Sequence, residues 1–248
     1  MTEALVQLTK LTRHYGQVVA VAGIDLSVQA GEIVALLGPN GAGKTTTLRM
    51  LTGQLRPTQG SAHIGGFDCF AERAKTMRIT GYLPDEPVFH EYLTGRELLR
   101  FVGGLHGMEA TEIAETAAYW VERLKIAEAI DDYAVNYSKG MKKKLGLALA
   151  LLHRPRLLIL DEPANGLDPM ASRTLLALLA EQAAAGTAIL FSTHLLDQAE
   201  RLCHRAAIIA HGRLVTAGRI DELREHVSDG GTLEQVFFAL TTEEANTE

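Results

Sequence analysis

One glycine-rich segment constrains the fold of this chain more than any other feature of its sequence. Residues 38–45 read Gly-Pro-Asn-Gly-Ala-Gly-Lys-Thr, which fits the phosphate-loop pattern G-x-x-x-x-G-K-[ST]. The segment follows a short apolar run at residues 33–37 and opens a helical pattern that carries Leu48 and Leu51. A strand before the loop and a helix after it are the context that this pattern requires. We therefore predict a phosphate-binding loop rather than an ordinary glycine-rich turn.

The chemistry of such a loop predicts what it binds. Glycines let the backbone fold around an anion, so that successive N–H groups and the helix N-terminus face the phosphates. Lys44 supplies a point charge, and Thr45 is placed to put its hydroxyl on a Mg²⁺ ion that bridges two phosphates. We expect a nucleoside triphosphate and Mg²⁺ as ligands. The predicted nucleotide-binding residues of the loop are Gly38, Pro39, Asn40, Gly41, Ala42, Gly43, Lys44, Thr45 and Thr46.

Two kinds of strand pattern occur along the chain. Residues 157–160 and 188–191 are continuous apolar runs like residues 33–37, which is typical of parallel strands covered on both faces. Residues 5–10 and 18–28 instead alternate apolar and polar side chains, which predicts an antiparallel β layer. Strands that alternate with helices favour an α/β fold with a mainly parallel sheet.

Helix signals divide the chain further. Thr94 and Glu97 form a capping-box pattern, and Asp168 before a proline predicts a second helix start, with that helix running to Gly186. We predict a P-loop NTPase (RecA-like) α/β core with the antiparallel β layer at residues 1–86 and 156–226. A helical subdomain inserted into this core is expected at residues 87–155. A C-terminal tail at residues 227–248 is expected to form a short acidic helix ending in disorder.

Chemically active side chains follow two of the predicted strands. Asp161 and Glu162 end the run at residues 157–160, and His194 follows the run at 188–191. Open α/β sheets bind ligands at the carboxyl ends of their strands. We expect Asp161 to hold Mg²⁺ through water, Glu162 to orient the attacking water, and His194 to contact the γ-phosphate. The alternatives are a carboxylate pair capping a turn and a structural histidine. Together with Lys44, Glu162 and His194 are the predicted catalytic residues.

A serine-containing segment precedes another apolar helix, at residues 145–152. Ser138 can cap that helix, which leaves the amides of Lys139, Gly140 and Met141 directed at an anion. Read alone, the segment is a capped helix. The three lysines that follow, at residues 142–144, are expected to form a solvated helix face rather than a nucleic-acid patch.

The order of these motifs resembles the nucleotide-binding domain of the ATP-binding cassette (ABC) transporter family, over residues 2 to about 225. The resemblance implies that residues 38–46 are the Walker A segment and residues 157–162 the Walker B segment, with Glu162 as catalytic glutamate. It further implies that Ser138 to Met141 are the signature that closes over the ATP of the opposite subunit. Tyr15 would lie under the adenine, Asp168 would belong to the D-loop, and His194 would be the switch histidine.

The resemblance also implies a function and partners. Two such domains close over two ATP molecules as a dimer, and residues 195–200 and 233–237 look most like exporter ATPases whose membrane subunits are separate chains. We therefore expect an ATPase subunit of an exporter, with a second nucleotide-binding subunit and transmembrane permease subunits as partners. Its expected place is the cytoplasm, peripheral to the inner face of the cell membrane.

Composition fits this expectation. The net charge of −6 disfavours a general polyanion-binding surface, so nucleic acid is not an expected partner. Two distant cysteines favour a reducing compartment. No apolar run approaches the roughly 18 residues of a membrane span.

One position departs from the family pattern. The family usually has glutamine after Tyr-Leu-Pro, and this chain has Asp85 there. We expect its carboxylate to lie within reach of the metal shell, and the alternative is a solvated turn residue. Lys139 and Met141 likewise replace the commoner glycine and glutamine. These departures leave open a non-hydrolytic ATP-dependent regulator. A soluble cassette ATPase not linked to transport is the other alternative, and a GTPase is disfavoured because no Asn-Lys-x-Asp segment occurs.

Overall fold

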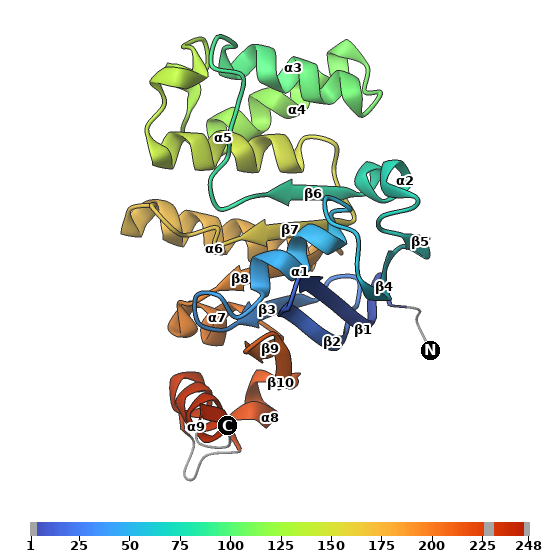
Figure 1. The fold of residues 1–248 in the computed structure, drawn as a ribbon. Coiled ribbons are helices and arrows are strands. Elements are labelled where there is room, and N and C mark those ends of the chain that lie inside the picture. Colours follow the sequence, from blue (N-terminus) through green and yellow to red (C-terminus); the bar gives the residue numbers. More distant parts are fainter. Residues whose placement is uncertain (1–3, 226–230, 246–248) are drawn as a thin grey trace.

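A six-stranded sheet forms the centre of the molecule (Figure 1). The computed structural model describes residues 4–225 and 231–245. The strand order is β10-β9-β3-β8-β7-β6, and every neighbouring pair except β9 and β10 is parallel. The strands are β3 (Ile33–Leu37), β6 (Thr80–Leu83), β7 (Leu157–Asp161), β8 (Ala188–Thr193), β9 (Arg205–Ala210) and β10 (Arg213–Arg219).

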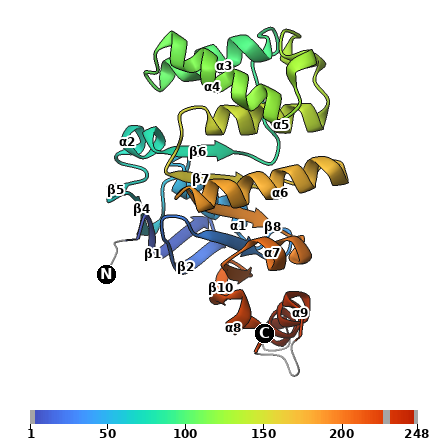
Figure 2. The same ribbon diagram turned by 180° about the vertical axis from the view of Figure 1, so that it is seen from behind.

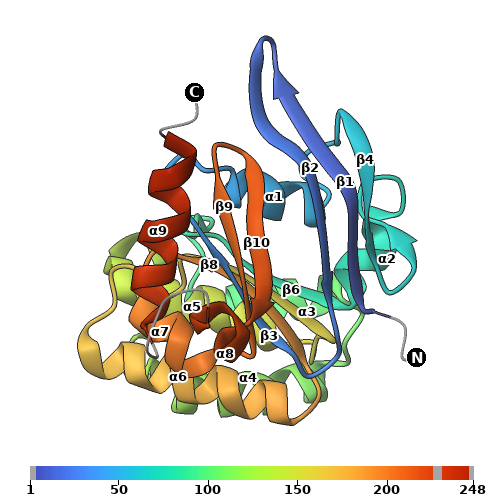
Figure 3. The ribbon, with the colours of Figure 1, turned by 90° about the horizontal axis from the view of Figure 1, so that it is seen from below.

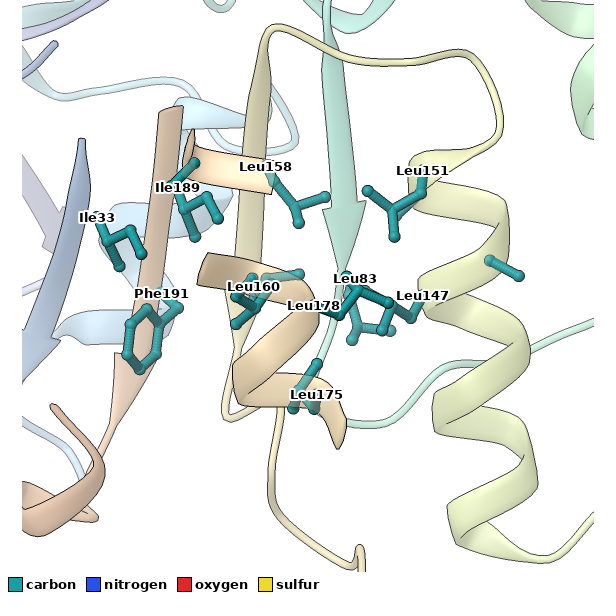
Figure 4. Close-up of a cluster of buried hydrophobic side chains, with 14 of the residues drawn as sticks. Ile33, Leu83, Leu147, Leu151, Leu158, Leu160, Leu175, Leu178, Ile189 and Phe191 are labelled. Carbon is teal, nitrogen blue, oxygen red and sulfur yellow. The ribbon is translucent and has the colours of Figure 1, made fainter. Parts of the chain in front are cut away.

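The continuous apolar runs are explained by cores on both faces of this sheet. In β3, Ile33 and Leu37 belong to one core, whereas Val34 and Leu36 belong to the other. Successive side chains of a strand point to opposite faces, so a strand buried on both sides must be apolar throughout. Figure 4 shows the first core, in which Leu147 from a helix lies beside Leu83 of β6. The predicted parallel strands are confirmed.

A second sheet, which is antiparallel, packs against the helix that follows the phosphate loop, on the side away from the six-stranded sheet. Its order is β2-β1-β4-β5, and Tyr15 pairs with Val18 across the first turn, as the alternating pattern predicted. The helix α1 (Lys44–Leu51) packs between the two sheets, and Figure 3 shows β2 beside the turn between β9 and β10. The strands are β1 (Val6–Tyr15), β2 (Val18–Val28), β4 (Gln59–Ile64) and β5 (Phe67–Asp68).

Residues 87–155 form helices on one side of the six-stranded sheet (Figures 1 and 2). The predicted capping box is present, because the Thr94 amide donates to Glu97 Oε2 at 2.8 Å and the Glu97 amide donates to Thr94 Oγ1 at 3.2 Å. That this segment acts as a separate subdomain stays a prediction. The helices are α3 (Gly95–Leu105), α4 (Ala110–Arg123), α5 (Lys139–Leu151) and the 3₁₀ turns Ala127–Ala129 and Ala134–Asn136.

The remaining helices lie around the core and in the C-terminal tail. Helix α6 begins after Asp168 as predicted but ends at Ala184, two residues before Gly186. The tail contains a helix as predicted, α9, and the expected disorder at its end falls outside the described residues. These helices are α2 (Arg73–Arg78), α6 (Pro169–Ala184), α7 (Leu196–Leu202), α8 (Ile220–Arg224) and α9 (Leu233–Ala245).

Helix α5 touches the sheet backbone to backbone at Gly81. A Cβ atom at Gly81 would lie 2.1 Å from the carbonyl oxygen of Ala150, so only glycine lets β6 and α5 approach this closely. This contact sets how close the helical segment lies to β6, the edge strand that Asp85 follows.

Substitution of Gly81 tests this contact. Gly81→Ala is expected to lower the free energy of unfolding by about 1–3 kcal/mol, because the backbone must shift to admit a methyl group. Thermal unfolding should show a loss of roughly 2–4 °C per kcal/mol in a chain of this size. The control is Gly104→Ala in α3, where an added Cβ meets nothing within 4 Å and the midpoint should stay or rise. Equal midpoints for Gly81→Ala and wild type would show that β6 and α5 are not held this tightly.

Candidate functional site

The phosphate loop joins β3 to α1 and has a backbone that only glycine allows at several positions. Gly41 and Gly43 have φ angles of +81° and +105°. A Cβ atom at Gly38 would lie 2.3 Å from the carbonyl oxygen of Ile209. Helix α1 begins at Lys44, and its N-cap residue Gly43 provides no side-chain hydrogen bond to the first amides. Such amides suit a phosphate.

Lys44 lies at the base of this loop. Its side chain is 7% exposed, and Nζ donates to the carbonyl oxygens of Gly38 at 2.6 Å and Pro39 at 3.2 Å. Burial lowers the pKa of Lys44, while the charges of Glu162 and Asp161 oppose that effect. A polyphosphate would be a stronger partner for this ammonium than two carbonyl oxygens are, because charge-assisted hydrogen bonds are the stronger kind.

The sequence-predicted loop residues share one pocket with side chains from two other strand ends. The loop contributes residues 39–46, Asp85 follows β6, and Glu162 follows β7, with Ala20 of β2 completing the wall. Because β3, β7 and β6 run in parallel, their carboxyl ends meet at this edge of the sheet. The pocket therefore combines phosphate-binding amides, one lysine and two carboxylates.

Glu162 is held between the two other predicted catalytic residues. Its Oε1 lies 3.8 Å from Lys44 Nζ, and its Oε2 lies 2.9 Å from His194 Nδ1. Its φ of +45° is unusual for a residue other than glycine, and its amide donates to the backbone oxygen and to Oγ of Ser192, at 3.2 and 3.0 Å. Strain of this kind persists where surrounding bonds enforce it. The structure thus brings Lys44, Glu162 and His194 together.

Asp161 lies deeper, at the end of β7. It is 2% exposed, and Ser192 Oγ donates to its Oδ1 at 2.5 Å. Ser192 therefore contacts both Walker B carboxyl residues, which the sequence analysis missed. The pairing of Asp161 with Ser192 between β7 and β8 is the signal that identifies this serine once the strand register is known.

The protein oxygens near the phosphate loop suit a magnesium ion whose other ligands are phosphate and water oxygens. In residues 4–225 and 231–245 there is no group of three histidine, cysteine or acidic side chains that could hold a metal. Mg²⁺ commonly takes one or two protein oxygens and fills its octahedron with phosphate and water oxygens. The hydroxyl of Thr45 and the carboxylate of Asp161 match that pattern.

The serine segment lies at the start of α5, as predicted. Ser138 Oγ accepts a hydrogen bond from the Met141 amide at 3.2 Å, and Lys139 Nζ lies 3.6 Å from Glu86 Oε1. Of the described residues that line the phosphate pocket, none comes from residues 138–141. Within one chain, the structure therefore does not bring the signature segment to the phosphate loop.

Two other predicted residues also lie outside that pocket. Tyr15 is 46% exposed at the end of β1, and the Arg13 guanidinium carbon lies 4.8 Å from its ring centre. Asp168 caps α6, where its Oδ1 accepts from the amides of Met170 and Ala171 at 2.9 Å each. These amide hydrogen bonds, that of Ala171 foremost, lower the pKa of Asp168.

The prediction that residues 142–144 form a solvated helix face is wrong for Lys143. Lys143 is 1% exposed, and its Nζ lies 3.0 Å from Asp85 Oδ1. Helical spacing places it on the same face as Leu147 and Ala150, which are buried against β6. The spacing of these residues could therefore have predicted that Lys143 is buried. Asp85 is accordingly paired with a lysine, and its side chain is 37% exposed, so its expected place at the metal shell stays a prediction.

No helix within residues 4–225 and 231–245 has the length and apolar character needed to cross a bilayer.

The fold and the site together define a P-loop nucleoside triphosphatase. A phosphate loop follows the central parallel strand β3, and the carboxylates that follow β6 and β7 line the same pocket. The chain belongs to the ABC transporter family, whose sequence profile matches residues 21–165. It is the ATP-binding and ATP-hydrolysing subunit of such a transporter.

Relatives and solved structures agree with this assignment. The chain is 42% identical to the uncharacterized ABC transporter ATP-binding protein YdbJ of Bacillus subtilis, over 86% of this chain and 69% of YdbJ. It is 37% identical to the daunorubicin/doxorubicin resistance ATP-binding protein DrrA of Streptomyces peucetius, over 88% of this chain and 66% of DrrA. A solved ATP-binding subunit of an ABC transporter superposes with a TM-score of 0.91 at 34% identity, covering 96% of this chain and 99% of that structure.

Proposed function

We propose that this subunit powers export of a compound as one of two ATPase subunits bound to separate permease subunits at the cytoplasmic face of the membrane. The observation that carries the proposal is the Glu162 carboxylate, which lies between Lys44 and His194 beside the phosphate loop. A glutamate fixed next to a phosphate site is placed for hydrolysis rather than for binding alone. The similarity to a drug-resistance protein supports the outward direction.

Each side chain then has a defined task. The loop amides and Lys44 bind the phosphates, and Tyr15 stacks on the adenine. Thr45 and Asp161 would hold Mg²⁺, which would supply positive charge against the phosphates. Glu162 orients and polarises the attacking water, and His194 moves from Glu162 to the γ-phosphate. Catalysis is then a matter of positioning and charge stabilisation.

The phosphate pocket of one chain is completed by a second copy or a related chain. Ser138 and Gly140 start a 13-residue helix whose first amides suit an anion, and they do not line their own phosphate pocket. A partner subunit can bring the equivalent amides, together with its Asp168, to the exposed side of the bound ATP. The working unit is therefore a dimer that closes over two ATP molecules.

Association with a membrane partner tests the proposal. The chain is co-expressed in turn with each polytopic membrane protein that neighbouring reading frames are found to encode, and membranes are sedimented. We expect the chain in the membrane fraction only when one of these proteins is present, with ATPase activity raised severalfold over the chain alone. Chelation of Mg²⁺ by EDTA should abolish the activity while the chain stays in the membrane fraction. A chain that stays in the supernatant with every such membrane protein would contradict the transport role.

A further inference from the structure

A buried lysine of α5 contacts the segment that follows β6. The Lys143 side chain is 2% exposed, and its Nζ donates to the backbone oxygen of Asp85 at 2.6 Å and lies 3.0 Å from Asp85 Oδ1. Asn165, from the segment between Glu162 and α6, donates its Nδ2 to the same Oδ1 at 3.1 Å. Groups from two other parts of the chain therefore fix the position of one carboxylate.

Asp85 supports the positive charge of the buried Lys143. Burial lowers the pKa of Lys143, and the hydrogen bond and charge of Asp85 oppose that effect. Lys139 adds to the lowering, and Asp161 opposes it. Removing Asp85 would leave the buried charge of Lys143 without its partner, which is unfavourable away from water, whereas the Asp85 side chain is itself 37% exposed. The two side chains therefore act as one nearly neutral unit.

The same carboxylate lines the phosphate pocket. Asp85 shares that pocket with Lys44, Thr45 and Glu162, so the pocket wall contains two carboxylates and one ammonium. ATP adds several negative charges to this arrangement. An unpaired carboxylate at Asp85 would repel the triphosphate, whereas a carboxylate neutralised by a buried lysine repels it far less.

We propose that Lys143 is a positioning residue for ATP binding, because its ammonium neutralises Asp85 and holds that carboxylate toward α5. The inference rests on the proposed function, in which ATP occupies the pocket at residues 38–46. A different role, in which the pair only stabilises the fold, would make both partners equally important. The proposal instead gives the two residues opposite effects on ATP affinity.

Four proteins distinguish these roles: wild type, Lys143→Met, Asp85→Asn and the double variant. Calorimetry measures the Kd of ATP in EDTA at low and high salt. Lys143→Met should raise the Kd about tenfold at low salt and less at high salt. Asp85→Asn should lower the Kd, because it removes a negative charge from the pocket wall. The double variant should return to within about threefold of wild type, because both charges are gone.

Controls distinguish the change in ATP affinity from the loss of one positive charge anywhere on α5 and from loss of folding. Lys142→Met removes the same charge from a less buried position of α5 and should bind ATP as wild type does. Thermal unfolding verifies that each variant is folded, and Lys143→Gln replaces Lys143→Met if the latter is not. Unchanged binding by Lys143→Met, or equal weakening by Asp85→Asn, would overturn the proposal. A wild-type chain that did not bind ATP would contradict the proposed function itself.

Discussion

Glu162→Gln is expected to reduce steady-state ATP turnover by about 10²-fold or more while ATP binding remains. Glutamine keeps the size of glutamate and its contact with His194, but it loses the carboxylate that orients and polarises water. A subunit that closes on ATP and cannot hydrolyse it should accumulate as an ATP-bound dimer. Size-exclusion chromatography with and without ATP measures that accumulation.

Two comparisons show whether the loss of turnover is specific to Glu162 and whether the dimer depends on ATP. Glu122→Gln makes the same chemical change on the exposed face of α4 and should hydrolyse ATP at the wild-type rate. Removal of ATP should return the Glu162→Gln dimer to monomer. Wild-type turnover by Glu162→Gln would show that another group positions the water.

Ser138→Arg is expected to abolish ATP-driven dimerisation and ATPase activity without loss of ATP binding. In the proposed dimer, Ser138 faces the partner's phosphates, so a bulky side chain there blocks closure. The same chain's Lys44 is unaffected, because residues 138–141 do not line its phosphate pocket. Sedimentation measures the dimer, and calorimetry measures ATP binding by the isolated chain.

A mixing experiment shows whether the two sites are shared. A dimer of Ser138→Arg with Lys44→Ala contains one intact pair, formed by Lys44 of the first chain and Ser138 of the second. Mixing two inactive variants should therefore restore part of the ATPase activity. Ser138→Ala controls for the loss of the helix cap, which costs about 1 kcal/mol, and should retain dimerisation. Loss of ATP binding by Ser138→Arg alone would mean that the serine serves its own chain.

The parallel strands next to the site were predictable because their burial on both faces leaves a continuous apolar pattern. Strands β3, β7 and β8 have this pattern, and the phosphate loop, Glu162 and His194 respectively follow their ends. Strand β6 was missed because it is only four residues long and contains a glycine and a threonine. Its identity depends on pairing with β7, which no local pattern encodes.

The residues of the site that follow buried strands were predictable from the same apolar pattern, whereas the contact between Lys143 and Asp85 was not. Lys44, Glu162 and His194 follow buried strands, so a shared sheet edge brings them together. The contact between Lys143 and Asp85 joins residues 58 positions apart, and it depends on how α5 lies against β6. Helical spacing alone places Lys143 on a buried face, but the sequence does not say which carboxylate meets it there.

The close approach of Gly81 to Ala150 makes α5 a lever. Ala150 lies near the end of the helix, whereas Ser138 lies at its start, twelve residues and about 18 Å away along the axis. A rotation of about 10° around the contact at Gly81 would displace Ser138 by roughly 3 Å. The cation of Lys143 lies between these two points and is tied to Asp85, so a small movement of the pocket wall would become a larger movement of the Ser138 end of α5, which the proposed dimer places against the second subunit.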